Sequence, residues 1–171
     1  VFDVHGEAYA LPIVKVERVL KVPQSAISTL ENKQFFDFGG EHLGLVPAAQ
    51  VLELGQIAPG AGELSVLVIG SAQRRYALVV DAIRGEHSLA VQALDPIFGK
   101  MRDISSAALL DDGAPVLILD VADLLLSIDK LLHEGGLHKL SAGDTARRSA
   151  RRVLVVDDSL TVREMERKLL L

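Results

Sequence analysis

At residues 76–81 the chain reads Tyr76-Ala77-Leu78-Val79-Val80-Asp81, an apolar run that opens with tyrosine and ends in aspartate. A similar stretch, Tyr9-Ala10-Leu11-Pro12-Ile13-Val14, lies 67 positions earlier. Each follows a short apolar segment and a turn, namely Val1 to Val4 with His5-Gly6 and Leu64 to Ile69 with Gly70-Ser71. Repetition at this spacing predicts two similar half-domains of about 65 to 70 residues. Chance similarity between two strand-rich halves is the alternative.

A second pair of matching segments lies further along the chain. Val46-Pro47-Ala48-Ala49-Gln50-Val51 lines up with Val116-Leu117-Ile118-Leu119-Asp120-Val121, 70 positions on. This second match supports the interpretation that the first 126 residues or so contain a duplication.

Short strand-like segments fill most of this region. They are rich in Val, Ile and Leu and are bounded by Gly, Pro, Asp or Ser, which is typical of strands. The predicted strands cover residues 1–4, 8–20, 43–46, 64–69, 76–83, 88–91 and 116–119. Pro12 restricts the second of these to an edge or to the start of a strand, since proline cannot donate to the ladder. Many short strands at this spacing favour a mainly β barrel or sandwich.

One helix is predicted, over residues 121–134. Its apolar side chains fall on one face at helical spacing: Val121, Leu124, Leu125, Ile128, Leu131 and Leu132. Asp120 suits the N-cap, because its carboxylate accepts hydrogen bonds from unpaired backbone N–H groups. Gly135 suits the C′ position, where the backbone is left-handed. The helix is expected to close the domain.

Composition excludes several classes of protein. The chain has 171 residues and no cysteine, and no apolar run reaches the roughly 20 residues of a membrane helix. Residues 1–140 carry 18 acidic and 11 basic side chains, and aromatic residues make up 4% of the chain. Such an acidic body disfavours nucleic-acid binding, which needs a basic face. We therefore expect a cytoplasmic protein that neither binds nucleic acid nor inserts into a membrane.

Motifs of catalysis are missing from the sequence. The five histidines show no pair at metal-ligand spacing, and neither a Gly-Lys-Ser/Thr phosphate loop nor a Gly-x-Ser-x-Gly elbow occurs. A thiol nucleophile is excluded by the absence of cysteine. The sequence favours a binding module over an enzyme.

The chain changes character after the predicted helix. Residues 135–151 gather Gly, Ser, Ala and Arg without periodicity, which predicts a linker. Residues 153–156 then form a continuous apolar run that ends in Asp157 and Asp158. Ligands of open parallel sheets lie beyond the carboxyl ends of the strands, and paired carboxylates suit Mg²⁺. A helix cap is the alternative role for this acidic pair.

From Arg152 to Arg163 the chain resembles the opening of response-regulator receiver domains. On that resemblance Asp157 and Asp158 are the acidic pair that holds Mg²⁺ beside a phosphorylated aspartate. The resemblance covers residues 152–171, a truncated start of such a domain, and the phosphoacceptor of the family lies outside this chain.

Residues 1–134 resemble the CheW-like domain, which occurs in chemotaxis adaptors and at the regulatory end of CheA-type kinases. The matching motifs are Tyr9 to Ile13, Gly44 to Pro47, Tyr76 to Asp81 with Gly85-Glu86, and Leu109 to Val121. The resemblance implies two intertwined five-stranded SH3-like barrels with an apolar groove between them. One departure is Ser106, where the family commonly has glycine, and this departure puts the usual backbone turn there in doubt.

The resemblance also implies a docking role. We expect the regulatory and docking segment of a hybrid CheA-type histidine kinase, most similar to the Wsp type, recruited to membrane-anchored receptor arrays. The implied partners are a CheW-like adaptor and the cytoplasmic tip of a chemoreceptor, and no cofactor is expected besides the Mg²⁺ of a complete receiver. The candidate docking residues are Leu43, Leu45, Val46 and Pro47, with burial in the core as the alternative. A CheV-type adaptor, in which a CheW domain joins a receiver without a kinase, is the alternative function.

Overall fold

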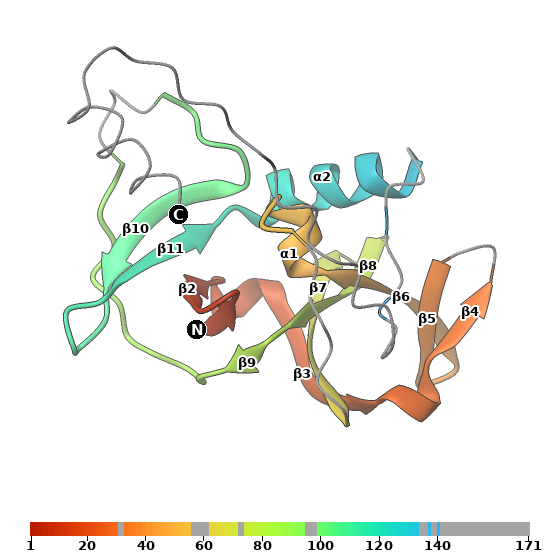
Figure 1. Ribbon diagram of the computed structural model, residues 1–171. Coiled ribbons are helices and arrows are strands. Elements are labelled where there is room, and N and C mark those ends of the chain that lie inside the picture. Colours follow the sequence, from red (N-terminus) through yellow and green to blue (C-terminus); the bar gives the residue numbers. More distant parts are fainter. Residues whose placement is uncertain are drawn as a thin grey trace, which may run out of the picture.

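The computed structural model describes residues 1–30, 33–55, 62–71, 74–94, 99–133, 137 and 140. Eleven strands, two α-helices and two short 3₁₀ helices lie within these residues (Figure 1). The strands form two sheets, and a longer helix follows the last strand. The predicted mainly β architecture is confirmed.

Five strands form the first sheet: β1 (Phe2–Val4), β2 (Glu7–Ala10), β9 (Ala82–Ile83), β10 (Ile104–Leu109) and β11 (Pro115–Leu119). Their order across the sheet is β10-β11-β2-β1-β9. Six strands form the second sheet: β3 (Val16–Pro23), β4 (Ser28–Leu30), β5 (Lys33–Phe38), β6 (Glu41–Pro47), β7 (Glu63–Ser71) and β8 (Arg74–Val80). Their order is β3-β7-β8-β6-β5-β4. The helices are η1 (Ile13–Lys15), η2 (Gln24–Ala26), α1 (Ala48–Val51) and α2 (Val121–His133).

The hairpin of β1 and β2 is equivalent to the hairpin of β7 and β8. Phe2 stands opposite Tyr9 in the first hairpin, and Ile69 stands opposite Tyr76 in the second. Both residues of the second pair lie 67 positions after their counterparts in the first. The matched tyrosines therefore occupy the same place in two copies of one structural unit, as the first repeat predicts.

The third strand of each copy crosses to the other sheet. β3 follows β2 in the chain but pairs with β7, where Val16 stands opposite Ile69. β9 follows β8 but pairs with β1, where Ile83 stands opposite Phe2. Val16 and Ile83 are again 67 positions apart, so the two copies have exchanged equivalent strands. This exchange is what makes the two barrels intertwined.

The second pair of matching segments is aligned differently in the structure than in the sequence analysis. β6 lies parallel to β8 with Gly44 opposite Tyr76, and β11 lies parallel to β2 with Leu117 opposite Tyr9. Because the two tyrosines are equivalent, Gly44 and Leu117 are equivalent too. These two residues are 73 positions apart, so the predicted offset of 70 is wrong by three residues.

The helices that follow these strands give the same offset. α1 begins at Ala48 and α2 at Val121, and these positions are also 73 apart. The sequence alignment matched Val46 with Val116 by residue type, whereas the structure matches Val46 with Leu119. Apolar strands look alike under a shift of a few residues, and the backbone pairing decides between the possible registers.

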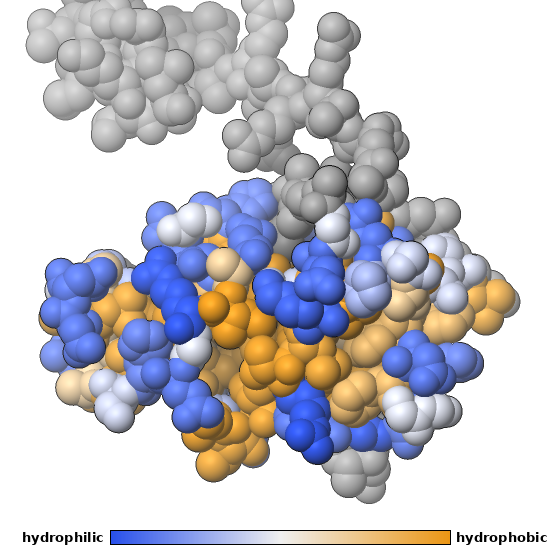
Figure 2. Space-filling view, turned by 90° about the horizontal axis from the view of Figure 1, so that it is seen from below, coloured by the Kyte–Doolittle hydropathy of each residue, from blue (hydrophilic) through white to orange (hydrophobic). Residues whose placement is uncertain are grey.

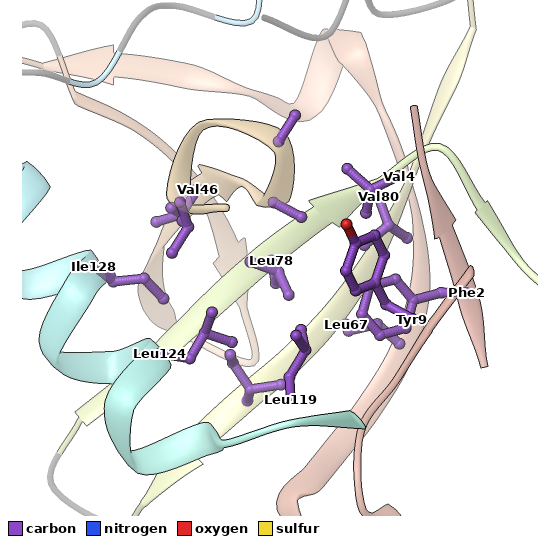
Figure 3. Packing of buried hydrophobic residues seen from close by; sticks show 14 residues of the cluster. Phe2, Val4, Tyr9, Val46, Leu67, Leu78, Val80, Leu119, Leu124 and Ile128 are labelled. Carbon is purple, nitrogen blue, oxygen red and sulfur yellow. The ribbon is translucent and has the colours of Figure 1, made fainter. Parts of the chain in front are cut away.

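Three clusters of buried apolar side chains form the core. The central core lies between the two sheets and beneath α1 and α2 (Figure 3). Its members include Phe2, Val4, Tyr9, Val46, Leu67, Ile69, Leu78, Val80, Leu119, Leu124 and Ile128. The first-sheet core comprises Ala10, Ala108, Leu110, Val116 and Ile118. The second-sheet core comprises Val22, Phe36, Leu43, Leu45, Leu64, Val66, Val68, Ala77, Val79 and Leu140.

Alternation along β7 explains how one strand serves two of these clusters. Leu67 and Ile69 belong to the central core, whereas Val66 and Val68 belong to the second-sheet core. Successive side chains of a strand point to opposite faces of the sheet. Both faces of β7 are therefore buried, which is why its sequence reads as a continuous apolar run.

The strand predicted at residues 88–91 is wrong. In the described chain this region forms only a bridge beside β10, in which the N–H and C=O groups of Gln92 bond to Ala107 at 2.8 and 3.0 Å. The segment belongs to the long connection between β9 and β10. The sequence patterns also do not predict β4, β5 and β10, because polar residues interrupt the apolar alternation in each.

The extended run predicted over residues 8–20 is divided in the structure. Pro12 lacks an N–H group, and the Lys15 N–H donates to the Pro12 carbonyl at 2.9 Å. This bond closes the 3₁₀ turn η1 between β2 and β3. The proline thus marks the point where the chain passes from the first sheet to the second.

The helix predicted over residues 121–134 is confirmed as α2, which spans Val121–His133. The Asp120 Oδ1 atom accepts hydrogen bonds from the N–H groups of Ala122 and Asp123 at 2.9 and 3.3 Å. Asp120 is therefore the N-cap, as predicted. The predicted C′ residue, Gly135, lies outside the described residues.

Ser106 is accommodated by an irregularity in β10. The register with β11 shifts between Ile104 and Ser106, and the Ser105 hydroxyl donates to the Ile118 carbonyl at 3.1 Å. Asp103, just before the strand, has a left-handed φ of 62°. The chain therefore makes a bulge at this place without a glycine.

The region after α2 is described only at Leu137 and Leu140, both within the predicted linker, and both pack against the core. The predicted receiver segment, 152–171, lies outside the described residues. Among the helices that the structure describes, none has the length and apolar character needed to cross a membrane.

Candidate docking surface

The four candidate docking residues lie in the interior of the domain. Leu43 and Leu45 belong to the second-sheet core and Val46 to the central core, and Pro47, at the end of β6, is also buried. Alternation along β6 sends these side chains to two different clusters. The structure therefore buries these four residues in the core, which was the alternative to docking. A docking surface must consist of other, exposed residues.

Exposed apolar side chains gather on η1 and β3. Val14 is 85% exposed, Ile13 58% and Val19 56%. Ile13 and Val14 lie in η1, which connects the first sheet to the second, and Val19 lies in β3. Large apolar side chains that are exposed together in this way mark interaction sites more often than single ones do.

The strand that carries Val19 is an edge strand. Within the residues that the structure describes, β3 is hydrogen-bonded to β7 alone, and its outer edge faces away from the second sheet. An open edge presents a row of backbone N–H and C=O groups to which another strand can bind. With eight residues, β3 is also longer than β4, the strand at the opposite edge.

The exposed residues of β3 continue the central core onto the surface. Val19 stands opposite Leu67, which belongs to the central core. A register shift between Val16 and Arg18 brings Val19 onto this face of the sheet. Val16 is partly buried against the same core. The apolar side chains of the central core therefore continue to the surface of the domain beside β3.

Figure 2, a view from below Figure 1, shows an apolar patch in the middle of the face that carries β3 and β9. We call Ile13, Val14, Val16 and Val19 the β3 surface. Hydrophilic groups surround the patch in Figure 2. Glu17, on β3 itself, forms an ion pair of 3.1 Å with Arg75. An apolar centre with a polar rim is the usual arrangement of a protein–protein interface.

A second exposed apolar pair lies on the first sheet. Leu109 ends the edge strand β10, and Val91 precedes the bridge between Gln92 and Ala107. Both side chains are exposed. Exposed apolar side chains therefore lie at an edge strand of each sheet. We call Val91 and Leu109 the β10 surface.

One signal in the sequence does point to the β3 surface. Ile13 and Val14 are adjacent large apolar residues directly after Pro12, so they fit neither the alternation of a strand nor a ladder position. The same sequence does not reveal that Val19 is exposed, because the register shift in β3 is set by its pairing with β7.

Helix α2 is fixed to the second sheet on the other side of the central core. The Tyr76 hydroxyl donates to Asp129 Oδ1 at 2.5 Å, and Arg74 forms an ion pair of 2.6 Å with the same carboxylate. Burial raises the pKa of Tyr76 to about 12, and the hydrogen bond to Asp129 acts in the same direction. These contacts join β8 to α2 and hold the central core closed.

A hollow beside the helices is lined mainly by polar and charged side chains. It has a volume of about 440 Å³ and lies between α1, α2 and the segment around Lys100 and Arg102. Its charges are paired within the fold: Lys100 lies 2.9 Å from Asp123, and Arg102 forms an ion pair with Glu53. No group of three or more potential metal ligands occurs among the described residues. Asp157 and Asp158, the predicted Mg²⁺ ligands, lie outside them.

Comparison with known proteins gives the same fold. A family model described as the CheW-like domain matches residues 1–129. The crystal structure of the scaffolding protein TtCheW from Thermoanaerobacter tengcongensis is similar, with a TM-score of 0.53 and 17% sequence identity. The similarity covers 72% of this chain and 88% of that one. At this identity the likeness concerns the fold alone.

Two curated proteins are similar in sequence. The chemotaxis protein CheA of Salmonella typhimurium is 34% identical over 122 residues, which are 71% of this chain and 18% of that protein. The sensor histidine kinase CheAY of Helicobacter pylori is 27% identical over 176 aligned positions, which cover 98% of this chain and 21% of that protein. The chain thus spans about a fifth of the length of these two relatives.

Proposed function

The chain belongs to the CheW-like domain family, and from this premise we propose that it is the docking module that couples a CheA-type histidine kinase to a CheW-like adaptor. The identity of 34% to Salmonella typhimurium CheA supports a kinase as the parent protein. In this role the domain supplies binding surfaces, and the chemistry belongs to other parts of the kinase.

The observation that carries this proposal is the β3 surface. It combines exposed apolar side chains with an open strand edge, so a partner gains both apolar burial and backbone hydrogen bonds there. The adaptor's own barrel edge is the kind of partner that such a surface fits. Interfaces of this kind draw most of their affinity from a few buried side chains near the centre.

The test is a calorimetric titration of the chain with a CheW-like adaptor from the same source. Val14→Asp and Val19→Asp each place a charge on the β3 surface at a side chain that does not support the core. Each substitution is expected to weaken binding at least about tenfold, because a buried unpaired charge opposes association. The variants should keep the thermal unfolding temperature of the parent chain.

Leu126→Asp is the matched control. Leu126 is 62% exposed, similar to Val19, but lies on α2 and away from the β3 surface. Its binding is expected to equal that of the parent chain. Equal binding by all three variants would contradict docking through the β3 surface, and equal loss in all three would indicate a general effect of added charge.

We also propose that the tip of a chemoreceptor helical bundle is a second partner. The β10 surface supports this proposal, because it gives the first sheet an apolar edge of its own. In a titration with a receptor-tip helical hairpin, Leu109→Asp should weaken binding and Val14→Asp should not. The opposite pattern would assign the receptor to the β3 surface.

We further propose that residues 152–171 begin a receiver domain in a hybrid kinase. The alignment with Helicobacter pylori CheAY supports this proposal, because it extends over 98% of the chain. Asp157 and Asp158 would then bind Mg²⁺, which is needed for phosphoryl transfer to an aspartate. In the polypeptide that includes the whole receiver, Asp157→Asn should abolish Mg²⁺-dependent phosphorylation by acetyl phosphate, and unchanged labelling would refute the assignment.

A further inference from the structure

The segment after α2 returns to the second sheet at Leu140. Its N–H group donates to Gln34 Oε1 at 2.6 Å, and Gln34 Nε2 donates to the Leu140 carbonyl at 3.1 Å. One side-chain amide of β5 thus pairs with both backbone groups of a residue 106 positions away. This is the same pair of bonds that a strand residue makes with its neighbour in a ladder.

The side chain of Leu140 is anchored as well. It is 8% exposed and belongs to the second-sheet core, together with Val22, Phe36 and Leu43. Leu137, three residues earlier, packs against the central core. A linker with no preferred position would leave these apolar side chains in solvent, so the contacts indicate a specific binding site.

We propose that Gln34 and the second-sheet core form an intramolecular site for Leu140, a clamp that fixes where the chain leaves the domain. The ligand of this site is an extended backbone segment that carries a leucine side chain. Gln34 selects the backbone, because its amide offers one acceptor and one donor at the spacing of a peptide unit. The apolar cluster selects the leucine.

The clamp determines the length of the connection that follows. With Leu140 bound, the next residues begin beside the hairpin of β4 and β5 instead of at the end of α2. Seven residues of extended chain span up to about 24 Å. Release of Leu140 from Gln34 would therefore increase the distance that a domain attached beyond residue 140 can move from the docking module.

Limited trypsin digestion of the whole chain tests the clamp. Cleavage after Lys139 requires the following bond to leave the site, so it should be slow in the parent chain. Gln34→Ala and Leu140→Ser should each accelerate this cleavage by about fivefold or more, the effect of losing one or two hydrogen bonds or a buried side chain. Cleavage after Arg147 and Arg148 provides an internal reference and should keep its rate.

Thr29→Ala is the control for the hairpin, since Thr29 stands opposite Gln34 on β4 and is exposed. It should leave cleavage after Lys139 slow. Hydrogen exchange of the Leu140 amide provides a second measurement, expected to be slow in the parent chain and in Thr29→Ala and fast in Gln34→Ala. Parent and Gln34→Ala chains that are cut and exchanged at equal rates would overturn the proposal, and so would a Thr29→Ala chain that behaves like Gln34→Ala.

Discussion

Tyr76 shows how a single side chain joins two elements of this fold. Its hydroxyl group donates to Asp129 on α2, a charged acceptor in a partly buried place. A hydrogen bond to a charged group contributes about 1.5–3 kcal/mol, less where solvent reaches it. We expect Tyr76→Phe to lower the free energy of unfolding at pH 7 by about 1–2 kcal/mol. Urea denaturation of the parent chain and the variant measures this difference.

The pH dependence of this difference is a second check on the same residue. The folded chain holds the phenol proton until about pH 12, whereas the ordinary pKa is 10.0. The protonated Tyr76 makes its full contribution to the free energy of unfolding below pH 10, and this contribution is lost as the pH rises toward 12. The gap between the parent chain and Tyr76→Phe should therefore shrink from pH 8 to pH 12. A gap of constant size would show that the hydroxyl contributes by packing only.

Asp103 is a buried carboxylate that works against folding when it is charged. Burial raises the pKa of Asp103, although Ser127 donates to its Oδ1 atom at 2.7 Å. Asp103→Asn keeps the acceptor for Ser127, and asparagine tolerates the left-handed φ of 62°. The variant is expected to unfold at a higher temperature than the parent chain at pH 7.

The sign of the Asp103 effect fixes its pH range. Burial disfavours the charged form of Asp103 in the folded state. The free energy of unfolding of the parent chain is therefore lowered most above the raised pKa, where the carboxyl is ionised. Below the ordinary value of 3.8 the aspartate is neutral in both states, and the advantage of Asp103→Asn should disappear. Thermal unfolding at pH 7 and pH 3 compares the two proteins. An advantage that persists at pH 3 would point to a cause other than charge.

At the scale of elements, helix α2 depends on its cap. Asp120 accepts hydrogen bonds from Ala122 and Asp123 at the start of the helix. Asp120→Ala should cost about 1 kcal/mol of unfolding free energy, because these N–H groups lose their partner. Asp120→Asn should recover most of it, since asparagine is an equally good cap. Circular dichroism during thermal unfolding measures both, and an equal loss in both variants would assign the effect to the charge.

The sequence predicts those elements whose apolar residues form a long, regular pattern. The apolar stripe of α2 and the runs of β7, β8 and β11 are long enough to identify each element. β4, β5 and β10 have no such pattern, because polar residues interrupt the apolar alternation in each. Their position depends on partners that are distant in the chain.

The candidate site illustrates a different limit of the sequence. The run around Leu45 is apolar enough to suggest a docking face, but it is apolar because β6 lies between two cores. The sequence of a strand does not show whether one of its faces or both are buried in the fold. The exposed Val19 looks no different from a core valine until the register of β3 is known.

At the scale of the whole molecule, the strand exchange predicts a single unfolding transition. Leu45 and Ile118 are equivalent residues, 73 positions apart, in the second-sheet and first-sheet cores. Leu45→Ala and Ile118→Ala should each cost about 2–4 kcal/mol. Both should shift the same transition, because neither barrel is complete without a strand from the other half. Hydrogen exchange in the two sheets measures this coupling, and two separate transitions would contradict it.

The duplication is visible in the sequence, but the exchange of strands is not. A chain in which each third strand stayed in its own sheet would show the same local pattern of Val, Ile and Leu. The resemblance to the CheW-like domain, and not the repeat itself, implies the intertwined arrangement. What decides it in the structure is the pairing of Val16 with Ile69 and of Ile83 with Phe2.

This pairing also constrains how the two halves can diverge over generations. Val16 lies in one half of the duplication and meets Ile69 in the other, and Ile83 meets Phe2 in the same way. A change in the size of one side chain is therefore compensated across the duplication and not within its own half. A substitution in one half therefore alters the packing around a residue of the other half, so the two halves must evolve in step.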